Sequence, residues 1–222
     1  MQFFIRTRQD LCEAVQAFGI LPLFTNSLHG FSVEEHVDPA VWFTDQEGVW
    51  EWKGPVIRET GCAYGKFFEK KAAFISREWF ADFANYRRDG YDFDARWEDG
   101  LANYKDKQLY DLLSAKAPVL SRHLKTDGDY RKGGRTGFDT SITRLQAQGY
   151  VLISDFVYER DRFGAPYGWG VAEYSTPEKH LGAAFCDTVY RREPPASYQR
   201  LLDHLRTLLP EAEDQALRKF LS

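Results

Sequence analysis

The chain has 222 residues, of which 43% are hydrophobic, 28% charged and 16% aromatic, and its formal net charge is -4. This composition is typical of a globular protein with a substantial core, and the aromatic share indicates that large rings fill much of that core. The acidic balance excludes a chain that is basic throughout, so any contact with nucleic acid would require a local basic patch.

The cysteines and the first residues bear on the cellular compartment. Cys12, Cys62 and Cys186 are far apart and lack CxxC spacing, which indicates free thiols in a reducing compartment. The opening MQFFIRTRQDL carries charge early and contains no apolar signal-peptide core, and no apolar run reaches membrane-spanning length. We therefore predict a cytoplasmic protein without a membrane partner, while the sequence leaves the oligomeric state open.

Sequence motifs that would hold a metal or a cofactor are absent. His29 and His36 lie near Glu34 and Glu35, but neither HExxH nor another metal-ligand spacing occurs. The chain also contains no P-loop, no GxGxxG before a helix and no GxSxG. We therefore expect no metal site and no cofactor.

The first segment is predicted to form short helices joined by a buried loop. Asp10 can cap an amphipathic helix over LCEAVQAF, which Gly19 ends. The apolar ILPLFTN is interrupted by Pro22, which favours a buried loop over a strand. Capping patterns at Ser32 and Asp38 then predict two further short helices.

Two aromatic stretches supply candidate pocket residues. In VWEWK, alternation predicts a strand that carries Trp50 and Trp52 on one face and ends at a Gly-Pro pair. These rings could stack on a base or fill a pocket, although rings on a strand face more often belong to the core. Tyr64 and Lys66 are separated by one glycine, and a lysine near a tyrosine could act as an acid or bind an anion. These four residues form the candidate pocket.

The rest of the first hundred residues predicts a hairpin and a helix. KFFEKKAAFIS has the pattern of a bent hairpin with Lys70 and Lys71 at its tip. Ser76 can cap a helix over EWFADFANYRRD, whose aromatic residues recur at helical spacing. GYDFDARWEDG has glycines at both ends, and we interpret it as a passage between two parts of the chain.

The next segment predicts two helices and a basic loop. KQLYDLLSA forms one helix, Ala117-Pro118 breaks it, and VLSRHLK resumes as a second helix. The polar, glycine-rich loop that follows carries Arg131, Lys132 and Arg135. These three side chains could contact phosphates, and a plain solvated loop remains the alternative because two aspartates dilute the charge.

A third helix and a hairpin complete this arrangement. Asp139 or Thr140 can cap the helix, whose exposed positions include Thr143 and Arg144. YVLISDFVYE and YGWGVAEY are joined across residues 160–166 by a turn that contains glycine, which predicts an antiparallel hairpin of the size of a wing. Helix, helix, helix and hairpin is the order of a winged helix-turn-helix.

Two arginines lie at the tip of this predicted wing. Arg160 and Arg162 could enter a minor groove or rest on a phosphate backbone. Glu159 and Asp161 alternate with them and weaken the local positive field, so a solvated tip is the alternative.

The predicted fold class is α+β, a winged helix-turn-helix with an N-terminal α+β part and C-terminal helices. After a Pro194-Pro195 linker, SYQRLLDHLRTLLP predicts an amphipathic helix, and a last helix runs to Leu221. We divide the chain into an N-terminal α+β part with aromatic-rich strands (1–100) and a winged-helix part with a C-terminal helical extension (101–222).

Several runs carry a resemblance to a known family. GVWEWKG, YGK, FADFANYRRDGYDFD, FDTSITRLQAQGYVLISDF and YGWGVAEYSTPE contain rare aromatic residues in a particular order. Over most of the chain they resemble the bacterial proteins grouped as AlkZ-related, which are similar to the winged-helix DNA glycosylases AlkZ and YcaQ. The resemblance to these glycosylases implies tandem winged helices that bind DNA.

The resemblance also implies a catalytic Gln-x-Asp or Gln-x-Gln pair. Gln146-Ala147-Gln148 has the Gln-x-Gln form at the end of the predicted third helix, and no Gln-x-Asp occurs. The neutral amides of Gln146 and Gln148 would orient a water molecule toward the anomeric carbon of a damaged nucleotide. A solvated helix end is the alternative interpretation of these two residues.

Two hypotheses from different classes follow. The first is a winged-helix DNA-binding protein resembling the AlkZ-related family, a relative of DNA glycosylases that acts in base-excision repair of alkylated or cross-linked duplex DNA. The second is a non-catalytic winged-helix scaffold for protein or small-ligand binding, which the acidic balance favours. The charge over the third helix and the wing discriminates between them. The candidate DNA-binding residues are Arg131, Lys132, Arg135, Thr143, Arg144, Arg160 and Arg162.

Overall fold

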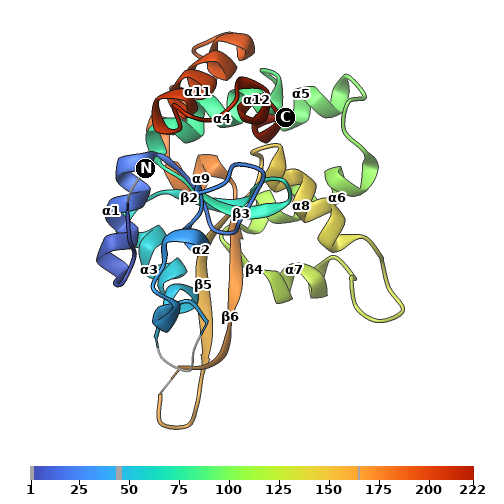
Figure 1. The fold of residues 1–222 in the computed structure, drawn as a ribbon. Coiled ribbons are helices and arrows are strands. Elements are labelled where there is room, and N and C mark those ends of the chain that lie inside the picture. Colours follow the sequence, from blue (N-terminus) through green and yellow to red (C-terminus); the bar gives the residue numbers. More distant parts are fainter. Residues whose placement is uncertain (1–2, 44–46, 165) are drawn as a thin grey trace.

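The computed structural model describes residues 3–43, 47–164 and 166–222, which fold around one antiparallel sheet (Figure 1). Among these residues, six strands lie in the order β1-β3-β2-β5-β6-β4. The strands are β1 (Ile20–Pro22), β2 (Ala63–Phe68), β3 (Lys71–Ile75), β4 (Val119–Leu120), β5 (Leu152–Arg160) and β6 (Pro166–Ser175). The predicted α+β class is therefore confirmed.

Helices surround this sheet. They are α1 (Arg8–Phe18), α2 (Val33–His36), the 3-10 helix η1 (Pro39–Val41), α3 (Val49–Thr60), α4 (Arg77–Arg88), α5 (Phe93–Glu98), α6 (Tyr104–Lys116), α7 (Ser121–Asp127), α8 (Phe138–Ala147), α9 (Pro177–Leu181), α10 (Ala183–Cys186), α11 (Pro194–Leu208) and α12 (Asp214–Leu221). In Figure 1, α1 and α3 lie to one side of the sheet, α6, α7 and α8 lie to the other, and α4, α11 and α12 gather at the top. None of the described helices combines the length and the apolar character needed to cross a bilayer.

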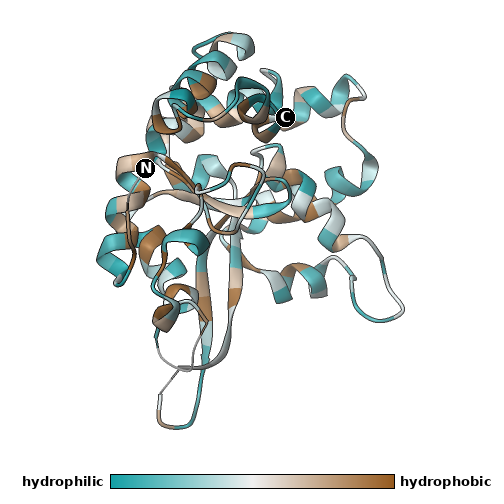
Figure 2. Ribbon diagram, in the orientation of Figure 1, coloured by the Kyte–Doolittle hydropathy of each residue, from teal (hydrophilic) through white to brown (hydrophobic). Residues whose placement is uncertain are grey.

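Both faces of the β2–β3 hairpin are buried. Tyr64 and Phe74 belong to a core that also includes residues of α1, α3, α6 and α8. Phe68 and Ala73 belong to a second core with residues of α4, α11 and α12. Because neighbouring strand residues point to opposite faces, this one hairpin separates the two cores. Figure 2 shows hydrophobic and hydrophilic segments alternating along the surrounding helices, as amphipathic packing requires.

The first helix is capped one turn earlier than the sequence analysis predicts. Thr7 is the N-cap of α1, and its side chain accepts a hydrogen bond from the backbone N–H of Asp10 at 3.2 Å. The Asp10 carboxylate accepts one in return from the backbone N–H of Thr7 at 2.9 Å. Asp10 is thus the third residue of a capping box and not the cap itself. Gly19 ends the helix, as predicted, with a φ of 68°.

Helix α3 corrects the prediction of a strand at VWEWK. Trp50 and Trp52 lie in the first turn of α3, whose start is stabilised by a hydrogen bond from the Gly48 N–H to the Glu51 carboxylate at 2.9 Å. Five alternating residues fit either a strand or a helix. Over the whole of α3 the buried residues recur at helical spacing, and the helix packs against β5. Pro55 lies inside the helix and does not end it.

The edge of the sheet corrects a second prediction. The pattern of ILPLFTN predicts a loop, but Ile20–Pro22 forms β1, which pairs antiparallel with β3 and places Pro22 opposite Ala73. Strand β1 lies at the edge of the sheet and has no neighbouring strand on its outer side. Proline has no N–H to donate, and an edge strand tolerates it because no hydrogen bond is needed on that side. Proline therefore marks an edge strand here.

The predicted hairpin at KFFEKKAAFIS is confirmed as β2–β3, with Phe68 opposite Lys71. Its two-residue turn is Glu69-Lys70, one position before the predicted tip. Both residues have positive φ values, 49° and 60°. A two-residue hairpin turn of this kind favours Asn-Gly, because other side chains are strained at positive φ.

Replacing Glu69→Asn together with Lys70→Gly is expected to raise the free energy of unfolding by about 1 kcal/mol, because both new residues tolerate positive φ. Urea unfolding followed by circular dichroism measures the change. Lys71→Gly is the matched control: it introduces glycine into the adjacent strand position and should lower stability. An unfolding midpoint of the double variant at or below that of the wild type would contradict this reading of the turn.

The segment between residues 104 and 147 differs from the prediction in detail. KQLYDLLSA lies in α6 as predicted, but VLSRHLK divides between β4 and α7, and Val119 of β4 pairs with Tyr174 of β6. Helix α8 starts at residue 138 after Gly137, which has a φ of 96°. Gly137 is the N-cap residue of α8, so the predicted caps Asp139 and Thr140 are wrong. Glycine suits this position because it adopts positive φ without strain.

The long hairpin β5–β6 is confirmed. It is antiparallel, with Ile153 opposite Tyr174 and Val157 opposite Val171. Residue 165 of its predicted turn lies outside the described residues. The predicted Pro194-Pro195 linker is wrong, because both prolines lie in the first turn of α11, where proline is favoured. GYDFDARWEDG contains helix α5, and its place as the passage between two parts of the chain stays a prediction.

Strands from both halves of the chain share the sheet. Tyr64 of β2 pairs with Ile153 of β5, which joins the β2–β3 hairpin to the β5–β6 hairpin. The division of the chain at about residue 100 stays a prediction, and it would run between strands of one continuous sheet.

Candidate nucleic-acid interface

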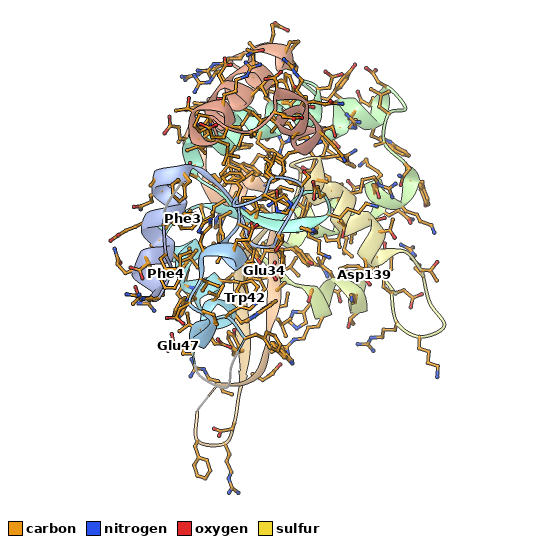
Figure 3. The ribbon with its side chains drawn as sticks, in the orientation of Figure 1. Phe3, Phe4, Glu34, Trp42, Glu47 and Asp139 are labelled. Atoms are coloured by element: carbon orange, nitrogen blue, oxygen red, sulfur yellow. The ribbon has the colours of Figure 1, made fainter. Side chains whose placement is uncertain are left out.

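A groove of about 540 Å³ lies between helix α8 and the β2–β3 hairpin. The hairpin contributes Lys66 and Lys70 to its wall. Helix α8 contributes Asp139, Thr140, Thr143, Arg144 and Ala147. In Figure 3 the Asp139 label marks the first turn of α8, whose outer face borders the groove. The structure thus brings Lys66, predicted as a pocket residue, next to Thr143 and Arg144, predicted as DNA-binding residues.

The groove is lined by more positive than negative charge. Within the described ranges, Lys66 and Lys70 form no ion pair. Arg144 is held by Asp106 of α6, with 2.7 Å between Nε and Oδ2. Asp139, the carboxylate of the groove, lies 3.5 Å from Lys125 of α7. Two lysine charges therefore remain available to an anion beside the exposed Thr140 and the half-buried Thr143 of α8.

Gln146 lies beneath the groove and is 1% exposed. Its amide nitrogen donates to the carbonyl oxygen of Ile142 at 3.0 Å, and its amide oxygen accepts from the backbone N–H of Lys66 at 3.1 Å. The side chain thereby ties α8 to β2. Gln148 is the C-cap residue of α8 and is half-buried, so the two glutamines occupy different surroundings.

Replacing Gln146→Ala is expected to lower the free energy of unfolding by about 1 to 3 kcal/mol, because the partly buried hydrogen bond from the Lys66 N–H loses its acceptor. Gln148→Ala is the matched control, and its effect should stay within about 0.5 kcal/mol, as for most surface substitutions. Urea unfolding of both variants measures the difference. Equal effects would show that the contact between α8 and β2 contributes nothing measurable to stability.

The predicted basic loop connects α7 to α8. Arg131, Lys132 and Arg135 are exposed there, and Arg131 donates from Nη2 to the hydroxyl of Thr126 at 2.7 Å. The backbone N–H of Arg135 donates to the carbonyl oxygen of Asp129 at 2.6 Å, which closes the loop on itself. The loop therefore presents its charged side chains to solvent beside the start of α8.

The end of the β5–β6 hairpin carries two further predicted residues. Arg160 donates from Nη1 to the carbonyl oxygen of Gly164 at 2.7 Å, and the guanidinium of Arg162 lies 4.7 Å from the centre of the Phe163 ring. Phe163 itself is 80% exposed. An ion pair between Arg122 of α7 and Glu159 holds the hairpin against the helices.

The candidate pocket residues do not line one cavity. Trp52 and Tyr64 are buried in the core, and burial raises the pKa of the Tyr64 phenol far above its usual value. Lys66 lines the groove beside α8. Trp50 belongs to an aromatic cluster that also contains Trp169 of β6, with 6.3 Å between ring centres.

Sequence reasoning missed Lys53 in this aromatic cluster. The residue is 8% exposed, and its Nζ lies 4.3 Å from the centre of the Trp50 ring and 4.4 Å from that of Phe156. Burial lowers the pKa of the Lys53 ammonium to about 8. A strand at VWEWK would have turned Lys53 away from the tryptophans. The helical spacing of Lys53 from Trp50 is the sequence signal that could have found it.

The comparison with protein families matches residues 5–222 to the family described as AlkZ related. The chain belongs to the AlkZ-related family. No curated protein and no solved structure matches the chain. Membership of the family confirms the resemblance stated from the aromatic runs and suggests a relation to AlkZ-like DNA repair proteins.

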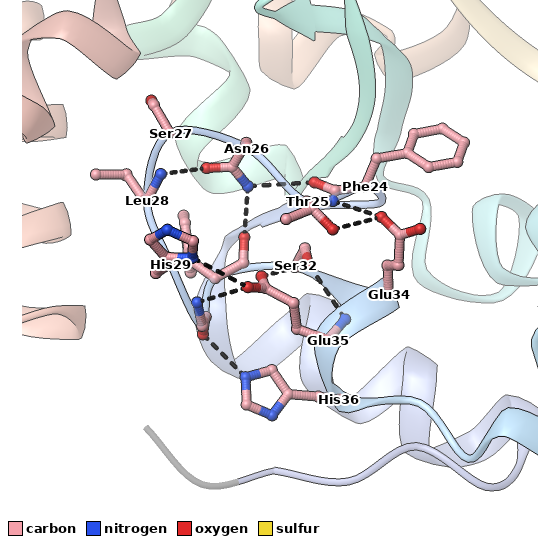
Figure 4. Close-up of polar contacts among 12 residues, drawn as sticks. Phe24, Thr25, Asn26, Ser27, Leu28, His29, Ser32, Glu34, Glu35 and His36 are labelled. Atoms are coloured by element: carbon pink, nitrogen blue, oxygen red, sulfur yellow. Dashed lines mark hydrogen bonds and ion pairs between the residues drawn. The ribbon is translucent and has the colours of Figure 1, made fainter.

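The AlkZ-related chain has a second depression, of about 440 Å³, between the segment 24–36, which ends in α2, and the connection from α11 to α12. Figure 4 shows that the polar side chains of this segment bind the segment itself. Glu34 accepts from the N–H and the hydroxyl of Thr25, at 2.7 and 2.6 Å. Glu35 accepts from the Ser32 hydroxyl at 2.6 Å. No group of three possible metal ligands occurs in the described part of the chain.

Proposed function

We propose that this AlkZ-related protein binds duplex DNA through a winged helix-turn-helix made of α6, β4, α7, α8, β5 and β6. The order of these elements supports the proposal. The pairing of the short β4 with β6 supports it further, because it closes a small antiparallel sheet beside the three helices. In this proposal α8 enters the major groove and the β5–β6 hairpin lies against the flanking backbone.

The observation that carries the proposal is the groove at α8. Lys66 and Lys70 face the outer surface of the helix without an ion-pair partner among the described residues. Lysines placed beside a helix that reads bases would contact phosphates and fix the position of the helix. Thr140 and Thr143 offer hydroxyl groups along the same surface, either to phosphates or to base edges.

The basic loop and the hairpin would extend this surface. Arg131, Lys132 and Arg135 would contact the backbone beside the start of α8, and Arg160 and Arg162 would do so at the hairpin. All five side chains belong to exposed residues. Because the whole chain is acidic, the proposed binding depends on these local cations and should weaken steeply with salt.

Fluorescence anisotropy with a labelled duplex tests the proposal. One duplex is undamaged and one contains a tetrahydrofuran analogue of an abasic site, and both are titrated at roughly 50 mM salt and again at roughly 200 mM salt. We expect binding to both at low salt and a loss of affinity at the higher salt. A folded protein with no affinity for either duplex at low salt would refute the proposal.

As a finer proposal, the protein is a DNA glycosylase relative that acts in base-excision repair of alkylated or cross-linked DNA. Family membership supports this proposal, as does the Gln146-Ala147-Gln148 sequence next to the groove. Gln148 is the more accessible of the two amides, so it would orient the attacking water, while Gln146 would position α8. Incubation with alkylated and with cross-linked duplex tests for base release, and unchanged release by Gln148→Ala would exclude this role.

A non-catalytic scaffold for protein or small-ligand binding is the second candidate. The ion pairs of Arg144 with Asp106 and of Arg122 with Glu159 favour it, because they neutralise cations that DNA would otherwise contact. The same titration decides between the two candidates. Absence of duplex binding by a folded protein would favour the scaffold.

A further inference from the structure

Lys53 occupies an unusual position between helix α3 and strand β5. Its ammonium group lies over the ring of Trp50, one turn earlier on the same helix, and over the ring of Phe156 on β5. The centroid distances are 4.3 Å and 4.4 Å. Two aromatic faces thus replace most of the water that would surround a lysine at the surface.

Neither polar group of this cluster has a protein acceptor. Within residues 3–43, 47–164 and 166–222, the Lys53 Nζ has no hydrogen-bond or ion-pair partner. The indole N–H of Trp50 is also buried and lacks an acceptor. Buried donors are nearly always paired in folded proteins, so the unpaired indole N–H of Trp50 is unusual. The Lys53 Nζ, one helical turn away, is not among the fully buried atoms and can still be reached from solvent, so the two donors together indicate a site for a ligand.

The nearby charged groups do not supply the missing acceptor. Glu51 of α3 accepts a hydrogen bond from the Gly48 N–H at 2.9 Å. Asp155 of β5 forms an ion pair with Arg58 and accepts from the backbone N–H of Phe156 at 2.7 Å. Both carboxylates are therefore engaged elsewhere, and the pKa of Lys53 is lowered to about 8 by desolvation. Near this pH about half of the side chain is a neutral amine, the form that attacks carbonyl carbons.

Exposed rings border the cluster on its open side. Phe43 and Trp169 are 63% and 70% exposed, and they stack on one another with 5.9 Å between ring centres. Each ring also meets Trp50, at 5.5 Å and 6.3 Å. Trp169 belongs to the β5–β6 hairpin, which the proposed function places against DNA, and Phe43 follows the 3-10 helix η1. Flat exposed rings of this kind stack on unpaired bases.

We propose that Lys53 is an amine nucleophile that forms a Schiff base with the open-chain aldehyde of an abasic site in DNA, beside the stacking surface of Phe43 and Trp169. This proposal rests on the proposed DNA binding. In the reaction the Nζ lone pair attacks C1′ of the sugar and forms a carbinolamine. Proton transfer to the hydroxyl group then releases water and leaves a C=N bond. No oxidant or reductant is needed.

Borohydride trapping tests the proposal, because hydride addition converts the C=N bond into a stable secondary amine. The protein is mixed with a labelled duplex that contains a true abasic site, reduced with sodium borohydride and separated on a denaturing gel, and the modified peptide is identified by mass spectrometry. We expect an adduct on Lys53 whose yield falls as the pH is lowered from about 8 to about 6, where the amine becomes protonated. Lys53→Arg should lower the yield at least about tenfold, since guanidinium stays protonated. Lys219→Arg, on α12, is the matched control and should trap like the wild type.

Two further measurements separate the possible failures. Binding to the tetrahydrofuran duplex, which has no aldehyde, reports on DNA binding alone. If that duplex binds and no Lys53 adduct forms, the nucleophile proposal is overturned while the proposed function stands. If no duplex binds and none is trapped, both are overturned. An adduct of Lys53 with free 2-deoxyribose but not with the abasic duplex would overturn the DNA substrate, and an adduct on another lysine would overturn the assignment to Lys53.

Discussion

Exchanging Lys66→Glu together with Lys70→Glu is expected to weaken binding to duplex DNA by about 100-fold or more at roughly 0.1 M salt. The two lysines line the groove beside α8 and form no ion pair with described residues, so their charge is free to meet phosphates. Glutamate would replace attraction with repulsion at the same positions. Each lost phosphate contact should also reduce the slope of log affinity against log salt by about one.

The control for this double variant is Lys219→Glu on α12, because this exposed lysine does not line the groove. It changes the net charge in the same direction and should leave the salt slope unchanged. Anisotropy titrations at several salt concentrations measure all three proteins. If Lys219→Glu and the double variant lose affinity in proportion to charge alone, the groove has no special role in binding.

Replacing Arg88→Met is expected to lower the free energy of unfolding by about 3 kcal/mol, because the hydrogen bonds of a fully buried guanidinium are lost. Arg88 is 1% exposed, and its guanidinium donates to Glu178, to the Tyr190 hydroxyl and to the carbonyl oxygen of Gly149, each at 2.8 Å. These contacts join α4 to α9 and to the end of α8. The substitution would leave the acceptors unpaired.

Thermal and urea unfolding measure this effect, and two variants make it interpretable. Arg206→Met removes the surface ion pairs with Asp203 and Asp214 and should change stability by no more than about 1 kcal/mol. Arg88→Met combined with Glu178→Leu should recover part of the loss, because the carboxylate is no longer left alone. A loss for Arg88→Met no larger than that for Arg206→Met would contradict the view that Arg88 anchors these helices.

Elements with a long or well-bounded pattern could be predicted from the sequence. The two hairpins combine apolar runs with short polar turns, and both are confirmed. Helix α4 and helix α11 have many apolar residues at helical spacing and are also confirmed. Short stretches were predicted wrongly: VWEWK fits two periods, and Ile20–Pro22 becomes a strand only because β3 lies beside it.

The candidate site could be predicted only in part, for a similar reason. Thr143 and Arg144 follow from the helical pattern of α8, and both line the groove. The groove also needs Lys70, which arrives from a hairpin about seventy residues earlier in the sequence. Lys53 becomes unusual only when Phe156 folds over it. Contacts between distant segments leave no periodic trace in a single sequence.

The joining of β2 to β5 has a consequence for dissecting this protein. A fragment that ends near residue 100 would keep β2 and β3 but lose β5, and the complementary fragment would lose β2. Each would expose an unpaired strand edge, which invites self-association through backbone hydrogen bonds. Truncation products are therefore expected to aggregate when made singly, and to rescue one another's solubility when produced together in the same cell.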